Sequence, residues 1–332
     1  YEVMVTANSG TYTYDGTEKS VSGFVNEDKD RIPVQANGQT YYVTGLTSEA
    51  SGTDVADSVA SIPVSGTAVV RDAAGNNVTS EFNVKITNGS LTILKRNVIL
   101  TSATDSKEYD GTPLTANEVT VGGDGFAEGE GASYTVTGSQ TLVGSSKNYF
   151  TYELNAGTNA GNYTITTQLG TLTVTNRDAK YEITVVANNR TEKYDGTEKA
   201  VSGFETTTFT IAGQTYTVEG LTAEAKGTDA GTYPANVTGT PVVKDVEGND
   251  VTSQFSVKTQ DGQLTITKRE ITLTSATDSK EYDGTPLTND EVTVGGDGLA
   301  EGEGASYAVT GSQTLVGSSQ NYFTYELNAE TN

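Results

Sequence analysis

Residues 101–115 read TSATDSKEYDGTPLT, and residues 274–288 repeat this stretch letter for letter. The repetition extends further, because residues 119–156 return as residues 292–329. Three positions differ between these longer copies: Phe126 becomes Leu299, Thr135 becomes Ala308 and Lys147 becomes Gln320. Copying a folded unit adds length, valency and spacing, whereas an active site is usually built once. The duplication therefore predicts an array of repeated domains.

The tetrapeptide YDGT occurs four times, at intervals of 95, 85 and 88 residues that fit small independent domains. Two types alternate: type A carries YDGTEKSVSGF or YDGTEKAVSGF, and type B carries VGGDG and AEGEGASY. The ABAB order separates near-identical sequences, which should limit misassembly during folding. We place the boundaries at residues 1–96 (module 1, type A), 97–176 (module 2, type B), 177–268 (module 3, type A) and 269–332 (module 4, type B).

Composition predicts an all-β protein. Val, Thr and Tyr recur in short alternating runs bounded by Gly, Asn and Asp, and helix signals are almost absent. We expect tandem immunoglobulin-like β-sandwich domains in an elongated array, with β-grasp-like small β domains as the alternative. A net charge of −23 opposes binding to nucleic acid or to an anionic bilayer. The sequence contains no run of 18 apolar residues, so it predicts no membrane-spanning helix.

Each complete module ends in a strand with alternating apolar residues. These strands follow short glycine-containing segments, TNGS from Thr87, TQLGT from Thr167 and TQDGQ from Thr259. The glycines predict tight turns, so we expect each module to close with a hairpin. Module 4 stops at Asn332, before a counterpart of residues 163–175, and should lack its last hairpin. A trimmed fragment would explain this, and the alternative is completion by a strand from a neighbouring molecule.

Two segments are typical of a tyrosine corner, in which a buried ring fixes a strand and its hydroxyl bonds back to the main chain. They are Asn159-Ala-Gly-Asn-Tyr163 in module 2 and Asp229-Ala-Gly-Thr-Tyr233 in module 3. The equivalent stretch of module 1, GTDVADSVASIPVSG, contains no tyrosine. We expect other packing to close that corner.

The modules are joined by short segments: Lys95-Arg96-Asn97, residues 175–180 and Lys268-Arg269-Glu270. They lack the Gly/Ser or Pro runs of flexible tethers, which predicts a semi-rigid rod of about 120–160 Å. We expect the basic pairs to bridge to carboxylates of the adjoining module, adding at most about 1 kcal/mol each. The inward face should change parity at two joints, from Leu91 and Ile93 to Val98 and Leu100, and from Leu264 and Ile266 to Ile271 and Leu273.

The residue types present leave few routes to chemistry, and we predict no catalytic, cofactor-binding or metal-binding residues. His and Cys are absent, which removes Ser-His-Asp and Cys-His relays and ordinary zinc sites. The acidic loops at residues 121–131 and 294–304 could bind Ca²⁺, although such Gly-rich loops are more often solvated connectors. The candidate calcium ligands are Asp124, Glu128 and Glu130, and their counterparts Asp297, Glu301 and Glu303.

Two further possibilities rest on lysine and tyrosine. An intramolecular Lys–Asn isopeptide bond needs a lysine on a buried strand face, but Lys107 and Lys280 lie in the polar run before YDG, so we do not expect one. The eighteen tyrosines could stack on sugars, with Tyr41 and Tyr216 as candidate exposed rings. Packing within the modules is the interpretation we favour for most of them.

The ordered recurrence of these motifs resembles the YDG and MBG-type repeats of large bacterial cell-surface proteins. It rests on the YDGT openings, VTGLT at residues 43–47, VEGLT at residues 218–222, the Ala-Gly-x-Tyr corners and the closing GTLTVT and GQLTIT strands. The resemblance implies a non-enzymatic stalk of a surface adhesin, extracellular and attached to a Gram-positive type of cell wall. No LPxTG-type sorting motif occurs here.

This resemblance also implies partners: adjoining domains of the same surface protein, and a host or microbial glycan or protein receptor. The alternative function is that the repeats themselves bind glycans or mucin by multivalent weak contacts. An enzyme is the third and least favoured interpretation.

Overall fold

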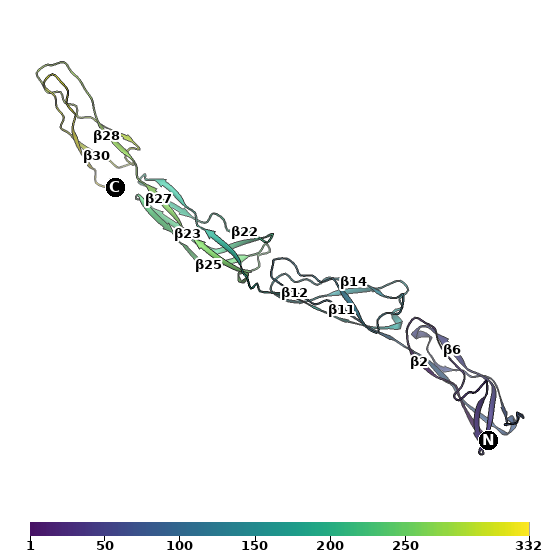
Figure 1. Ribbon diagram of the computed structural model, residues 1–332. Helices are drawn as coiled ribbons and strands as arrows, with labels where there is room; N and C mark the ends of the chain where they lie inside the picture. Colours follow the sequence, from purple (N-terminus) through teal and green to yellow (C-terminus); the bar gives the residue numbers. More distant parts are fainter. Residues whose placement is uncertain (332) are drawn as a thin grey trace. The chain divides into compact units, whose positions relative to one another are not determined.

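A computed structural model describes residues 1–331, and it confirms the all-β prediction. The helical elements among these residues are four 3-10 turns of three residues each, and none could cross a membrane. The strands fall into two compact units, Tyr1–Thr175 with modules 1 and 2 and Asn176–Asn332 with modules 3 and 4 (Figure 1).

The first unit contains strands β1 to β18 in small paired sheets. Module 1 has β1 (Glu2–Thr6), β2 (Gly10–Thr13), β3 (Lys19–Ser22), β4 (Ile32–Ala36), β5 (Gln39–Thr47), β6 (Glu49–Gly52), η1 (Val55–Asp57), β7 (Val59–Ile62), β8 (Ser65–Arg71), η2 (Thr79–Glu81), β9 (Asn83–Thr87) and β10 (Gly89–Leu94). The first strand of module 2, β11 (Arg96–Ser102), begins one residue before the boundary that we predicted. The module continues with β12 (Asp105–Glu108), β13 (Val119–Gly123), β14 (Ala132–Val136), β15 (Gly144–Lys147), β16 (Phe150–Leu154), η3 (Ala160–Asn162), β17 (Tyr163–Gln168) and β18 (Thr171–Thr175).

The second unit repeats this plan with fewer strands in its last module. Module 3 has β19 (Tyr181–Val186), β20 (Arg190–Lys193), β21 (Lys199–Ser202), β22 (Thr208–Ile211), β23 (Gln214–Gly227), β24 (Gly231–Ala235), β25 (Val237–Lys244), η4 (Thr252–Gln254), β26 (Phe255–Gln260) and β27 (Gly262–Thr267). Module 4 has β28 (Ile271–Ser275), β29 (Val292–Gly296), β30 (Ala305–Val309) and β31 (Phe323–Leu327).

The predicted closing hairpins are wrong. The two strands on either side of each glycine do not pair with each other; they are halves of one interrupted strand. Both halves run parallel to the two halves of the module's first strand: β9 and β10 on β1 and β2, β17 and β18 on β11 and β12, and β26 and β27 on β19 and β20. The element without a counterpart among the described residues of module 4 is therefore an interrupted strand and not a hairpin.

Close approach of two backbones explains the glycine at each interruption. Gly89, Gly170 and Gly262 do not adopt positive φ, as a turn glycine would. A Cβ placed on Gly170 would lie 2.2 Å from the carbonyl oxygen of Ala103, and one on Gly89 would lie 1.9 Å from that of Asn8. No side chain fits there, so only glycine lets the backbones of the first and last strands approach this closely.

The predicted inward faces are confirmed at the joint between modules 1 and 2. Leu91, Ile93, Val98 and Leu100 are each 2% exposed or less. Along β10 the buried residues alternate with half-buried ones, as a period of two requires. The switch of parity takes place at Lys95, the single residue between β10 and β11.

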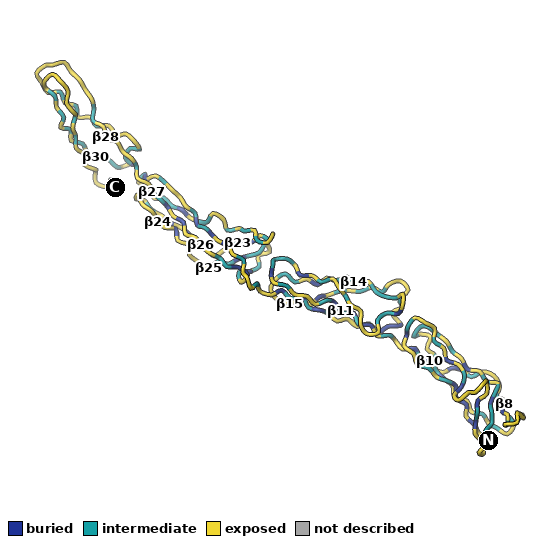
Figure 2. The backbone as a smooth tube through the Cα atoms, in the orientation of Figure 1, coloured by how far each residue is buried: buried dark blue, intermediate teal, exposed yellow. Residues whose placement is uncertain are grey.

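At the joint between modules 3 and 4 the same prediction fails for the second strand. Leu264 and Ile266 are buried, but Ile271 is 39% exposed and Leu273 is half-buried. In module 2 the corresponding strand β11 is covered on one edge by β17, which has no counterpart among the described residues of module 4. Figure 2 shows the consequence: buried positions are frequent in modules 1 to 3 and scarce in module 4.

Candidate functional site: the joints within each unit

An arginine clamps each joint between a type A and a type B module. The Arg96 guanidinium donates to the carbonyl oxygens of Gly125 (2.8 Å) and Asp124 (2.6 Å) in module 2, and of Tyr14 (3.3 Å) in module 1. Arg269 repeats the pattern with Gly298 (2.7 Å), Asp297 and Tyr194 (3.2 Å). A planar guanidinium with five fixed donors suits several acceptors at once.

This geometry corrects the prediction that the basic pairs bridge to carboxylates. The acceptors of both arginines are main-chain carbonyls, because the acidic loop turns its backbone toward the joint. The carboxylate of Asp124 instead accepts the main-chain N–H of Asn97 at 3.0 Å, and that of Asp297 accepts the N–H of Glu270 at 2.9 Å. Lys95, the other member of the first pair, is exposed.

The YDGT tyrosine of each type A module also crosses the joint. The Tyr14 hydroxyl donates to one carboxylate oxygen of Glu130, and the Tyr163 hydroxyl donates to the other. The two rings are each 3% exposed and pack edge-on, with centroids 5.5 Å apart. In the second unit Tyr194 donates to Glu303 in the same way. The tyrosine of YDGT is therefore a contact between modules as well as part of a turn.

Two features were predicted for each tyrosine corner, a buried ring and a local bond from the hydroxyl to the main chain, and each corner has only one of them. The Tyr233 hydroxyl donates to the carbonyl oxygen of Asp229 at 2.9 Å, the expected local bond, but its ring is only partly buried against the core. The Tyr163 ring is buried, yet its hydroxyl accepts the distant N–H of Ala127 at 3.0 Å. The predicted local bond is wrong for Tyr163 because Glu130 and Ala127 occupy its hydroxyl.

Asn162, which the sequence interpretation missed, is the third polar contact of the first joint. Its side chain is 1% exposed; its Oδ1 accepts the N–H of Val55 at 2.9 Å and its Nδ2 donates to Asp54 at 2.7 Å. These partners belong to the stretch of module 1 that has no tyrosine, so module 2 helps to close that corner. The available signal was the change from Thr232 in the type A corner to asparagine in type B.

An apolar cluster continues through the first joint without interruption. Module 1 and module 2 both contribute to it, and they share its buried interior. Its buried members are Tyr14, Val21, Ile62, Leu91, Ile93, Val98, Leu100, Ala127 and Tyr163. Turning one module against the other would open this cluster, so the joint resists bending.

The second joint is less complete. Lys193 forms an ion pair with Asp297 at 2.7 Å. The pKa of Asp297 is lowered, chiefly by the hydrogen bond from Lys193 and next by the one from the N–H of Glu270. No counterpart of Tyr163 or Asn162 exists among the described residues, and a hollow of about 390 Å³ lies between Tyr194, Leu299 and Glu303. The joint keeps its arginine clamp but not its full packing.

The calcium candidates do not gather into a site. Asp124, Glu130, Asp297 and Glu303 bond to protein groups at the joints, while Glu128 and Glu301 are exposed. Among residues 1–331, no three Asp, Glu, His or Cys side chains are placed to hold a metal ion. The acidic loops are joint-forming segments, which corrects the interpretation of them as solvated connectors.

The tyrosines proposed as exposed rings were also chosen wrongly. Tyr216 is 1% exposed and packs on Phe255 with ring centroids 4.7 Å apart. Tyr41 is half-buried against Phe82, with ring centroids also 4.7 Å apart.

Lys107, which was considered for an isopeptide bond, lies in β12. Its Nζ donates to Asp110 and Thr112, each at 2.7 Å.

The joint tyrosines predict a late phase in an alkaline titration. Burial and the bond to Glu130 raise the pKa of Tyr14 and of Tyr163 to about 12, and the bond to Glu303 raises that of Tyr194 to about 12. Because the folded state holds these protons more tightly, the stability they contribute is full below pH 10 and is lost as pH rises through about 12. Tyrosinate absorbance should show this phase.

The Tyr14→Phe variant provides the control for this titration. It should remove one proton from the late phase, while Tyr163, whose hydroxyl also donates to Glu130, should still titrate late. A titration of the folded chain that is complete well below pH 12 would contradict the placement of these hydroxyls against carboxylates.

Comparison with known proteins adds little. No protein-family model matches the sequence, and no curated protein matches it. Among solved structures the chain is similar to an endo-fucoidan hydrolase, MfFcnA4 from glycoside hydrolase family 107, with 12% sequence identity and a TM-score of 0.17. The match covers 77% of this chain and 42% of that one. At this TM-score the likeness carries no argument about fold or activity.

Proposed function

We propose that this chain is a non-enzymatic spacer of a bacterial surface adhesin, in which the modules hold a binding domain away from the cell envelope. The observation that carries the proposal is the shared apolar cluster of modules 1 and 2, closed by the Arg96 clamp. A spacer must hold the domains at its two ends at a fixed distance, and a joint that resists bending contributes to this. The extracellular, wall-attached location belongs to the same proposal and rests on the resemblance of the YDGT modules to YDG and MBG-type repeats.

Composition supports the same function. The high negative charge keeps neighbouring stalks apart and in solution, and it gives no surface for nucleic acid. The polar groups at the joints are used to connect modules: Glu130 accepts two tyrosine hydroxyls and Arg96 binds three carbonyls. These side chains serve spacing in the proposal, not chemistry.

The experiment measures stiffness within the first unit. The chain has no cysteine, so Ser20→Cys in β3 and Thr151→Cys in β16 provide two unique, exposed sites for spin labels. Double electron–electron resonance should give one narrow distance distribution between modules 1 and 2. Arg96→Ala should broaden it, because three carbonyls lose their shared donor.

Lys95→Ala is the matched control, since it removes the same charge from the adjacent, exposed position. It should leave the distribution narrow. A broad distribution in the unaltered chain would show that the joint is a hinge, and the spacer function would then be abandoned.

A further inference from the structure

The YDGT turn of each type A module lies against the acidic loop of the next module in its unit. Tyr14 bonds at this joint through both its hydroxyl and its carbonyl oxygen. Gly16 also lies at the joint, since a Cβ placed on it would be 3.4 Å from the Cβ of Ala127. In the second unit the corresponding distance, from Gly196 to Ala300, is 3.7 Å. The shape of the turn therefore decides how the tyrosine and the glycine meet the next module.

In module 1 the Asp15 carboxylate holds this turn in shape. One of its oxygens accepts the N–H of Thr17 at 2.9 Å and the hydroxyl of Thr17 at 2.6 Å. The other accepts the Lys19 ammonium group at 2.5 Å, and the same ammonium group donates to the Thr17 hydroxyl at 2.7 Å. In both type A modules the pKa of this aspartate is lowered, chiefly by the bond from the lysine. Module 3 repeats the four bonds with Asp195, Thr197 and Lys199.

In type B modules the lysine comes from the opposite side of the motif in sequence. Lys107 lies two residues before the YDGT tyrosine, whereas Lys19 lies five residues after it. The Lys107 ammonium group still donates to both Asp110 and Thr112. Module 4 repeats this with Lys280, which lies 3.0 Å from Asp283 and 2.6 Å from Thr285. Lysines at two different places in the sequence thus reach the same pair of side chains, and we call the aspartate, threonine and lysine of each module its YDGT lock.

The lysines of the four locks are more covered than other paired lysines. Their side chains are 14–29% exposed. The other lysines with ion pairs in residues 1–331 are 54–58% exposed, namely Lys85, Lys193 and Lys258. An exposed ion pair contributes little, but here the aliphatic part of the lysine is packed and its ammonium group has two acceptors.

Each module has the lysine at one of the two positions and not at the other. In module 1 the position before the tyrosine holds Tyr12, and in module 3 it holds Glu192. The strand register shows that Tyr12 is equivalent to Lys107. Tyr12 lies opposite Ile93 in the parallel pair of β2 and β10, and Lys107 lies opposite Val174 in that of β12 and β18.

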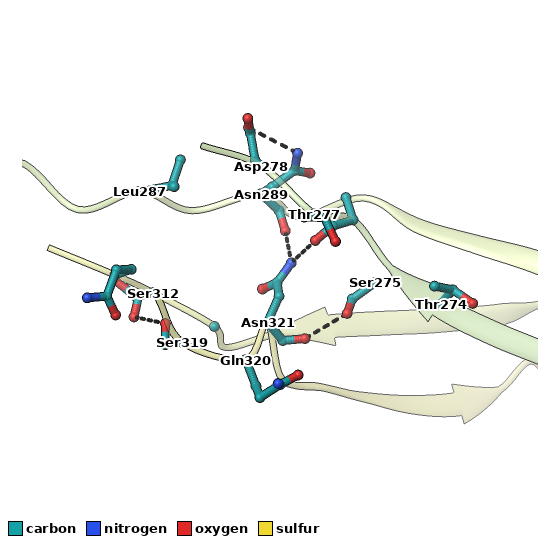
Figure 3. A pocket seen from close by; sticks show the side chains of 13 residues that line it. Thr274, Ser275, Thr277, Asp278, Leu287, Asn289, Ser312, Ser319, Gln320 and Asn321 are labelled. Carbon is teal, nitrogen blue, oxygen red and sulfur yellow. Dashed lines mark hydrogen bonds between the residues drawn. The ribbon is translucent and has the colours of Figure 1, made fainter. Parts of the chain in front are cut away.

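The position after the tyrosine holds a leucine in both type B modules. Leu114 is 7% exposed, so this place belongs to the interior of module 2. Figure 3 shows its counterpart Leu287 among the side chains that line a hollow of about 440 Å³ in module 4. A leucine cannot bond to the aspartate, so in type B the lysine has to come from the other position.

We propose that a lysine is a required part of the YDGT motif and that either of these two positions can supply it. In type A modules it is a positioning residue: through Asp15 or Asp195 it fixes the turn that carries the joint tyrosine. The lock sets the shape of the turn in any array of these modules, so it does not depend on the proposed spacer function.

The test follows amide hydrogen exchange of the full chain by mass spectrometry. Lys19→Met keeps a straight aliphatic side chain and removes the ammonium group. Exchange in residues 15–20 should become about tenfold faster, because the turn is no longer held. Exchange in the facing loop, residues 124–130, should also rise, since Tyr14 reaches Glu130 from this turn. The fragments are assigned by Ser20 and Phe126, where the second unit has Ala200 and Leu299.

The decisive variant combines Lys19→Met with Tyr12→Lys, which places the type B lysine in a type A module. It should return the exchange of both segments to within about twofold of the unaltered chain. Lys29→Met is the matched control, because it removes the same charge from an exposed position in module 1 and should change neither segment. The turn of module 3 is the internal control.

Three results would overturn the proposal. One is unchanged exchange of the turn in Lys19→Met. Another is a double variant that exchanges as fast as Lys19→Met, which would mean that the second position cannot supply the lysine. The third is an equal rise in β9, or loss of the folded module, because Lys19 would then stabilise module 1 as a whole and would not position its turn.

Discussion

Gly170→Ala is expected to unfold module 2 or to displace its last strand, with a loss of about 3 kcal/mol or more in the free energy of unfolding. The methyl group would lie 2.2 Å from the carbonyl oxygen of Ala103 and 2.4 Å from that of Ser102. Both oxygens belong to the first strand of the module, so relief requires the two strands to separate. That separation also breaks the bond from the N–H of Gly170 to Ser102.

Urea denaturation followed by circular dichroism measures this loss, and Gly122→Ala is the control. Gly122 lies in the same module, does not have positive φ, and a Cβ on it would find its nearest neighbour at 3.7 Å. The control should change stability by less than about 1 kcal/mol. Equal effects of the two substitutions would mean that glycine is needed for chain flexibility and not for the close approach of the two strands.

Leu91→Ala is expected to cost about 2 to 5 kcal/mol, the range for a buried leucine reduced to alanine. Leu91 is 0% exposed in the cluster that modules 1 and 2 share. The cavity therefore removes packing from residues of both modules. We expect both to lose protection against hydrogen exchange together, although the substitution lies in module 1.

Leu94→Ala in the same strand is the control, because Leu94 is 48% exposed and should cost less than about 1 kcal/mol. Hydrogen exchange read separately over residues 1–94 and 96–175 distinguishes the outcomes. If module 2 kept its full protection in Leu91→Ala, the two modules would be energetically independent, contrary to the shared cluster.

Sequence patterns predicted the parts of this fold that depend on local order. Alternation with a period of two identified the buried faces of β10 and β11, including the change of parity between Ile93 and Val98. Exact duplication predicted two alternating module types. The same patterns could not predict that Glu130 and Asn162 lie at a joint, because their partners Tyr14 and Asp54 are over one hundred residues away in sequence.

The sequence by itself determined that the chain is all-β and which residues of β10 and β11 face inward, since both follow from the order of apolar and polar residues. Tertiary structure alone decided that these glycines mark a close approach of two strands and not a turn, because glycine is compatible with both and the position of the neighbouring strand determines which one forms. The tetrapeptide Asp-Ser-Lys-Glu, which occurs twice in the sequence, illustrates the reason. It forms a strand at residues 105–108, where β18 satisfies its main-chain groups, and none at residues 278–281, where no described strand does so.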